Sequence, residues 1–171
     1  MKRVWINNEE ASELLIFCNG WGMDAATLSN LEISDGLDVL NLFDYTIPDI
    51  DLDIACLVAG YDKVSLVAWS LGVWAAAELF YDSNIRFVTA TAVAGTLEPY
   101  SDDYGIPVQI FEASMRQWNF NTRRKFERRI YLPFANQAGM HFVSPERYPG
   151  DQCNELMAIR ARMDDGQVNT G

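Results

Sequence analysis

The chain has 171 residues, of which 49% are hydrophobic and 22% are charged. This length is sufficient for one domain with a buried core, and the composition excludes a chain that is disordered throughout. The formal net charge of −11 at neutral pH argues against a general nucleic-acid-binding protein.

The distribution of apolar residues and cysteines narrows the class of protein further. No apolar run approaches the roughly 20 residues that cross a bilayer, so we expect no membrane partner. The first ten residues include two basic residues without an apolar run after them, so we expect no signal peptide and a cytoplasmic location. Three widely spaced cysteines and a single histidine predict free thiols, with neither a disulfide framework nor a metal site. We expect no cofactor.

Strand and helix patterns alternate over the first 95 residues. Short apolar runs predict strands, and amphipathic runs between turn residues predict helices. In chain order, the predicted elements are strands over 4–6 and 13–20, a helix over 23–31, a strand over 37–45, a helix over 49–61, a strand over 63–69, a helix over 71–82 and a strand over 85–95. The near-continuous apolar strands favour an α/β fold of the α/β-hydrolase kind. We expect a mostly parallel sheet with helices on both faces.

The pattern changes after residue 105. Residues 106–115 fit either a strand or an extended entry into helices, and helix-like patterns follow over 121–131 and 151–163. We therefore divide the chain into a core over 1–105, a helical lid over 106–163 and a tail over 164–171.

Ser70 lies between a predicted strand and a predicted helix, in the sequence Ala68-Trp69-Ser70-Leu71-Gly72. A nucleophilic serine in an open α/β sheet projects from such a turn, which requires small residues two positions before and two after it. Ala68 and Gly72 meet that requirement. We interpret Ser70 as a nucleophile; the alternative is a serine whose hydroxyl caps the following helix.

The loop CNGWGMD, residues 18–24, follows an earlier predicted strand and is the second part of the expected site. An oxyanion hole in this fold takes one N–H from the residue after the nucleophile, here Leu71, and one from such a loop. Gly20 and Gly22 allow the backbone to approach a ligand closely, and Trp21 between them would supply the N–H. The alternative is an Asn-Gly turn without a catalytic role.

The segments FCNGWGMD and AWSLGVWAA together resemble the α/β-hydrolases that cleave pimeloyl-carrier-protein methyl ester in biotin synthesis, and more closely their compact BioG-type branch. Residues 105–130 strengthen this resemblance, which covers about residues 1–163. It implies a serine carboxylesterase in which Ser70 is acylated, methanol leaves and water hydrolyses the acyl-enzyme. It also implies that Trp21 and Leu71 lend oxyanion N–H groups and that the partner is an acyl carrier protein bearing a pimeloyl methyl ester.

A basic island lies between residues 116 and 129, where six basic residues accompany one acidic residue. The island carries a charge of +5, whereas the rest of the chain carries −16. Acyl carrier proteins are strongly acidic, so the resemblance suggests that this island binds the carrier. The candidate residues for that contact are Arg123, Arg124, Arg128 and Arg129; the alternative is a solvated helix face.

The acid and the base that should accompany Ser70 are not evident. In this fold both follow the nucleophile along the chain, and the only histidine, His141, lies in the predicted lid. Asp44 and Glu98 each follow a predicted strand, and like His141 they match no family motif. Three explanations remain open: a shortened product of a gene for the full esterase, a fragment whose missing part is supplied elsewhere, or an unusual dyad.

Two other functions also remain open. The chain would then be a non-catalytic module that binds an acyl chain or a carrier protein, or else a small-ester esterase or thioesterase. We further expect the last strands of the hydrolase fold to be absent, which would expose a sheet edge that a homodimer would cover.

Overall fold

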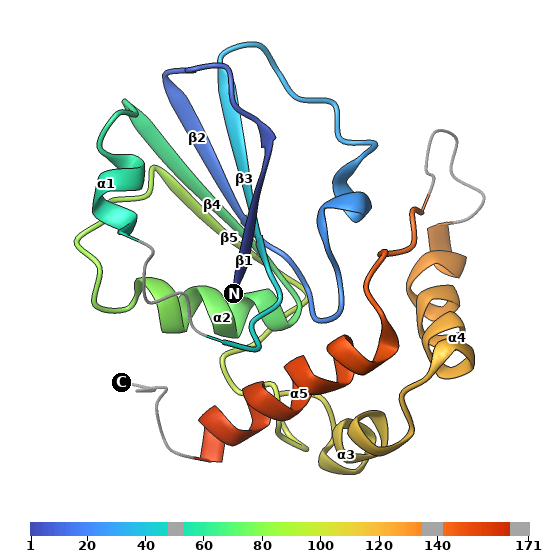
Figure 1. The fold of residues 1–171 in the computed structure, drawn as a ribbon. Helices are drawn as coiled ribbons and strands as arrows, with labels where there is room; N and C mark the ends of the chain where they lie inside the picture. Colours follow the sequence, from blue (N-terminus) through green and yellow to red (C-terminus); the bar gives the residue numbers. More distant parts are fainter. Residues whose placement is uncertain (48–52, 135–141, 165–171) are drawn as a thin grey trace.

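A five-stranded sheet forms the body of the computed structural model, which describes residues 1–47, 53–134 and 142–164 (Figure 1). The strand order is β1-β3-β2-β4-β5. These strands are β1 (Lys2–Asn7), β2 (Glu13–Cys18), β3 (Leu37–Phe43), β4 (Lys63–Trp69) and β5 (Thr89–Val93). Strands β2 to β5 are parallel and β1 pairs antiparallel with β3, so the expected mostly parallel sheet is confirmed.

Five α-helices accompany the sheet in the described residues. They are α1 (Ile54–Val58), α2 (Leu71–Phe80), α3 (Val108–Gln117), α4 (Phe120–Tyr131) and α5 (Pro149–Asp164). Figure 1 shows α3, α4 and α5 gathered beyond the carboxyl ends of the parallel strands, where β4 passes into α2. None of the described helices is both long and apolar enough to cross a membrane.

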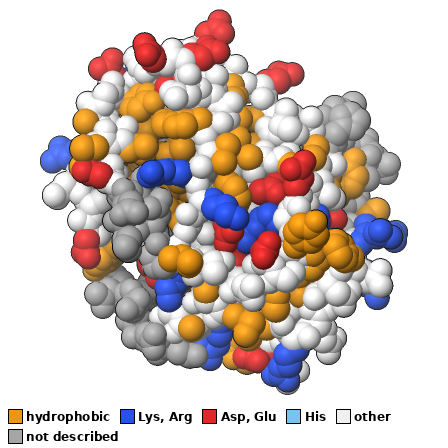
Figure 2. Space-filling model, in the orientation of Figure 1, with side chains coloured by type: hydrophobic (Ala, Val, Ile, Leu, Met, Phe, Trp, Pro, Cys, Tyr) orange, Lys and Arg blue, Asp and Glu red, His pale blue; other side chains and the backbone are white. Residues whose placement is uncertain are grey.

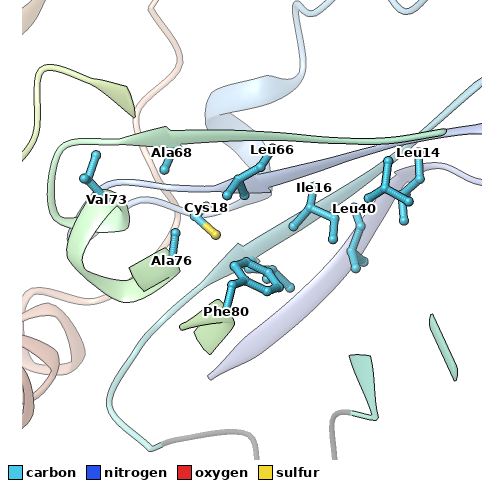
Figure 3. Packing of buried hydrophobic residues seen from close by; sticks show 11 residues of the cluster. Leu14, Ile16, Cys18, Leu40, Leu66, Ala68, Val73, Ala76 and Phe80 are labelled. Carbon is cyan, nitrogen blue, oxygen red and sulfur yellow. The ribbon is translucent and has the colours of Figure 1, made fainter. Parts of the chain in front are cut away.

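The main core lies on one face of the sheet. Burial alternates along β2 and β4, because successive side chains of a strand point to opposite faces. Buried side chains of β2, β3 and β4 pack against α2 on this face (Figure 3). Leu57 and Val58 of α1 pack against the same cluster.

The opposite face of the sheet differs from the expectation. Leu15, Phe17 and Val67 point to it and stay only half-buried, although Val39 and Asn41 of β3 are fully buried on the same face. Within the described residues, α1 and α2 therefore cover one face, and the expected helical cover on both faces is wrong for the other.

Three predicted elements change length or type. The helix expected over 23–31 is only the 3-10 helix η1 (Ala25–Leu28), although Asp24 caps it as expected, accepting a hydrogen bond from the N–H of Ala26 at 3.0 Å. Strand β5 begins at Thr89 because Phe87 leaves the sheet to pack edge-on against Phe80 of α2. The ambiguous segment 106–115 is largely the helix α3.

Candidate functional site

Ser70 occupies a strained turn between β4 and α2. Its backbone has φ +56° and ψ −127°, in the half of conformational space that residues other than glycine rarely adopt. Its N–H donates to the carbonyl of Val93 at 2.9 Å, which ties the turn to the end of β5. Its hydroxyl makes no capping hydrogen bond to α2. The structure thus argues against the capping alternative and presents the hydroxyl for other contacts.

Close backbone contacts explain the glycines around this turn. A Cβ on Gly72 would lie 2.2 Å from the carbonyl oxygen of Cys18, and a Cβ on Gly95 would lie 2.3 Å from that of Ser70. A Cβ on Gly20 would lie 3.0 Å from the ring of Trp69. Gly72 therefore lets α2 begin directly against the end of β2.

Two backbone N–H groups beside Ser70 are available for a ligand. Within the described residues, neither the N–H of Trp21 nor that of Leu71 has a hydrogen-bond partner. Trp21 is part of a tight turn in which the N–H of Met23 donates to the carbonyl of Gly20 at 3.2 Å, and Gly22 adopts φ +73°. This arrangement has the components of an oxyanion hole, which needs unpaired donors held in place.

A cavity of about 1220 Å³ opens over the turn. Ser70, Trp21 and Leu71 all line it, and α3 and α4 supply part of its apolar wall, including Phe111 and Phe126. The described part of the lining contains cationic side chains, from Lys125 and Arg129, but no carboxylate or imidazole. The cavity suits a long apolar chain with a reacting group at its base.

The chain is similar in sequence and in structure to known proteins. The sequence model of the family described as pimeloyl-ACP methyl esterase BioG matches residues 1–164. The chain belongs to the BioG family. A crystal structure of BioG from Haemophilus influenzae is similar, with a TM-score of 0.79 and 32% sequence identity; the match covers 98% of this chain and 74% of that one.

Two curated relatives share parts of their length with this BioG-family chain. A malonyl-[acyl-carrier protein] O-methyltransferase of Bacteroides fragilis is 34% identical over 147 residues, which are 86% of this chain and 29% of that protein. An uncharacterized protein of Haemophilus influenzae is 37% identical over 121 residues, which are 71% of this chain and 54% of that protein. The chain thus spans less than two thirds of either curated relative.

The described candidates for the catalytic acid, Asp44 and Glu98, do not lie at Ser70 in this BioG-family structure. Asp44 follows β3, and β2 lies between β3 and β4 in the sheet. Its carboxylate is engaged by Lys2 at 2.9 Å and by Arg147 at 3.0 Å. Glu98 is exposed and does not line the cavity. His141 lies outside the described residues.

The pKa of Asp44 reflects these contacts. Burial raises it, but hydrogen bonds from Thr46 and Lys2, together with the charge of Arg147, outweigh burial and hold the pKa below its usual value. The group is therefore a stabilised carboxylate within an ion cluster.

The arginines of the basic island differ in their contacts. Arg116 is exposed and pairs with Glu112 of α3 at 2.8 Å. Arg123 is only 12% exposed; it pairs with Glu127 at 2.7 Å and donates to the carbonyls of Arg147 and Pro145. Its contacts are internal, so it no longer belongs with the residues expected to meet a partner. Arg124, Arg128 and Arg129 are exposed, as is Lys125, and none of the four has an ion-pair partner in the described part of the chain.

Three residues that contact the candidate site were not found from the sequence. Gln152 and Glu155 of α5 hydrogen-bond to Gly22 of the loop that carries Trp21, and Arg147 pairs with Glu155 at 2.6 Å. Gln152 and Glu155 share a helix face with the fully buried Ile159, so polar residues interrupt an apolar face. That interruption was the available signal. Within the described residues, no cluster of His, Cys, Asp or Glu could hold a metal ion.

Proposed function

We propose that this chain carries the nucleophile and the substrate pocket of a serine carboxylesterase that hydrolyses the methyl ester of pimeloyl-acyl carrier protein in biotin synthesis. The strained backbone of Ser70 at the base of an apolar cavity is the observation that carries the proposal. The family supports the substrate class. The curated relative from Bacteroides fragilis, of which this chain covers 29%, is named for O-methyl transfer to malonyl-acyl carrier protein, a reaction that forms a carrier-bound methyl ester.

The proposed reaction begins with attack of the Ser70 hydroxyl oxygen on the carbonyl carbon of the ester. The negative charge that develops on the carbonyl oxygen is stabilised by the N–H groups of Trp21 and Leu71. Methanol leaves, and water then hydrolyses the acyl-enzyme to release the carboxylate. The general base that removes the proton from Ser70 is not assigned, and His141 stays the only imidazole candidate in the sequence.

The cavity supports an uncharged acyl end at Ser70. Its walls near the serine are apolar, with Leu71, Val93 and Phe111 among the lining residues. A neutral methyl ester loses little hydration on entering such a pocket, whereas a carboxylate would lose much more. The cavity therefore favours the ester over the product.

Helix α4 supports docking of an acidic carrier, and we propose it as the lid of the esterase. Phe120, Arg124, Arg128 and Leu132 recur at every fourth residue, and all four are exposed. Two arginines between two apolar side chains form a surface that suits an acidic helix. Figure 2 shows acidic side chains along the upper margin of the visible face, whereas acidic and basic side chains lie side by side in its middle and lower parts. The docking proposal therefore rests on the exposed arginines of α4 and not on a separation of charge across this face.

One observation favours the second candidate function, a module that binds an acyl chain or a carrier protein without catalysis. The described lining of the cavity holds no carboxylate and no imidazole that could activate Ser70. A serine without its base loses several orders of magnitude in rate, because the members of a triad act as a unit.

Reaction with a fluorophosphonate probe separates these functions. An esterase labels at Ser70 and loses the label in Ser70→Ala, whereas a binding module fails to label while remaining folded. A comparison of carrier-bound pimeloyl methyl ester with a free short ester then tests the substrate. Equal kcat/KM for the two esters would contradict the carrier-specific role and favour a general esterase or a thioesterase.

A further inference from the structure

The loop that carries Trp21 is held from outside by one helix. Both backbone polar atoms of Gly22 bond to side chains of α5: its N–H donates to Glu155 Oε2 at 3.0 Å, and its carbonyl accepts from Gln152 Nε2 at 2.7 Å. In addition, the indole N–H of Trp21 donates to the backbone carbonyl of Gln152 at 2.7 Å. These three bonds join residues about 130 positions apart in the chain.

Gln152 and Glu155 are built into the protein interior. Their relative exposures are 1% and 0%. They lie three residues apart, so both side chains project from the same face of α5. The two bonds hold the two successive peptide units on either side of the Gly22 α-carbon, which restricts the backbone at Gly22 more than a single bond would.

Arg147 balances the charge of Glu155. The carboxylate accepts bonds from the N–H of Gly22, the N–H of Tyr45 and, at 2.6 Å, the guanidinium of Arg147. An unpaired carboxylate at this place would oppose the negative charge that develops on the substrate carbonyl. Paired with Arg147, Glu155 can anchor the loop with little net charge toward the site.

Gln152 also links the loop to the helices that form the cavity wall. Its Oε1 accepts a bond from the indole N–H of Trp118 at 2.8 Å, and the rings of Trp118 and Trp21 lie 4.4 Å apart. Trp118 lines the cavity directly after α3. The same side chain thus contacts the oxyanion loop and the substrate wall.

We propose that Gln152 and Glu155 are positioning residues. They hold the backbone on both sides of Gly22 so that the N–H of the preceding residue, Trp21, points at the substrate oxyanion. The role rests on the proposed esterase function. Displacement of an oxyanion donor by a fraction of an ångström lowers the rate of the chemical step. Glu155 neither lines the cavity nor bonds to a residue of its wall that the structure describes, so its replacement should leave pocket affinity unchanged, whereas Gln152 also bonds to Trp118 of the wall.

The experiment measures labelling of Ser70 by a fluorophosphonate over a range of probe concentrations, which separates the maximal labelling rate from the half-saturating concentration. Gln152→Met keeps the side-chain length but removes the bond to Gly22. Glu155→Gln keeps the shape of the side chain but replaces one carboxylate oxygen with an NH₂ group. Both oxygens accept N–H hydrogen bonds, from Gly22 and from Tyr45, so one of these bonds is lost. We expect each to lower the maximal rate about tenfold or more. The half-saturating concentration should stay unchanged in Glu155→Gln, which leaves the bond between Gln152 and Trp118 in place.

The matched control is Ile159→Val. Ile159 is buried on α5 one turn beyond Glu155, and its side chain makes no hydrogen bond to the loop. It should label at the wild-type rate. All proteins are compared below their own unfolding temperatures, and amide hydrogen exchange of Gly22 gives a second reading that does not need catalysis. Exchange at Gly22 should accelerate in Glu155→Gln and not in Ile159→Val.

The outcomes are distinguishable. A folded wild-type chain that does not label contradicts the proposed function, and this role with it. A wild-type chain that labels, alongside folded Gln152 and Glu155 variants with unchanged maximal rates and unchanged Gly22 exchange, overturns the positioning role alone. A fall confined to those two variants supports it.

Discussion

The α-carbon of Gly95 faces the carbonyl oxygen of Ser70 so closely that a Cβ at residue 95 would lie 2.3 Å from that oxygen. The same Cβ would lie 2.4 Å from a methyl carbon of Val73. The segment after β5 is therefore in direct contact with the turn that carries Ser70. The shape of that turn depends on a residue 25 positions away.

Gly95→Ala should displace the turn, since real Cβ atoms do not approach backbone oxygen this closely. We expect a loss of about 1–3 kcal/mol in the free energy of unfolding, together with slower labelling of Ser70. Chemical denaturation and fluorophosphonate labelling measure the two effects. Gly60→Ala is the matched control, because a Cβ there meets nothing within 4 Å. Equal effects of the two substitutions would contradict the close approach.

The backbone strain at Ser70 makes a separate prediction. Glycine adopts positive φ without a steric cost, whereas alanine keeps the strain of serine. Ser70→Gly should therefore be more stable than Ser70→Ala by about 1 kcal/mol, and both should be unreactive toward the probe. Thermal and chemical unfolding of the two variants give the difference. A Ser70→Gly protein less stable than Ser70→Ala would mean that the turn is not strained.

The exposed arginines of α4 allow a test of the proposed docking of an acyl carrier protein. Replacing Arg124 and Arg128 with glutamate should lower kcat/KM for carrier-bound methyl ester by about tenfold or more, because electrostatic attraction to the acidic carrier is reversed. Turnover of a free short ester should change little.

The double substitution Lys63→Glu with Arg86→Glu is the charge-matched control. Lys63 begins β4, at the end of that strand away from Ser70, and both residues are exposed. If the control pair lowered carrier turnover as much as the α4 pair, net charge alone would account for the effect.

Asp44 predicts how stability depends on pH. Its pKa is lowered in the folded protein, so its stabilising contribution is complete above its unfolded pKa of about 4 and is lost as the pH falls through the folded value. Asp44→Asn should lower the free energy of unfolding by roughly 1–2 kcal/mol at pH 7, and the difference should disappear in acid. Asparagine tolerates the φ of +55° found here.

Urea unfolding of wild type and of Asp44→Asn checks this prediction. The series runs from about pH 2 to about pH 7, which spans the usual pKa of an aspartate. Burial raises the pKa of Glu155 and so contributes the opposite trend, but Glu155 is present in both proteins and affects both curves. Glu98→Gln, a change at an exposed carboxyl, is the control. A constant difference between wild type and Asp44→Asn at all pH values would show that Asp44 does not titrate in the ion cluster.

Local patterns explain what the sequence could predict. The strand before Ser70, the helix after it and the capping residue Asp24 depend on neighbours within a few positions, and all three are present. Within the residues that the structure describes, the N–H groups of Trp21 and Leu71 have no hydrogen-bond partner, which is compatible with the expected oxyanion hole. Their catalytic roles stay predictions, as do the domain boundaries and a homodimer.

Long-range contacts explain what the sequence could not predict. Glu155 reads as one more polar residue on a helix, and nothing nearby in the chain indicates that it meets Gly22 and Tyr45. Arg123 belongs to a run of basic residues, and only the folded chain shows that it turns inward to Glu127 and to backbone carbonyls. The half-covered face of the sheet was missed for a similar reason, because strand patterns report burial but not the element that provides it.

The attachment of α5 to the loop at Gly22 has a consequence for protein engineering. The helices beyond the sheet are not an interchangeable module, because one of them also sets the backbone of the reactive centre. A chimaera that takes α3 and α4 from a relative but keeps its own α5 would preserve the contacts to the loop. A chimaera that takes α5 from a relative would preserve them only if that helix supplied equivalents of Gln152 and Glu155. Efforts to alter substrate preference by exchanging the cavity wall should therefore cut the chain before residue 149, at the start of α5.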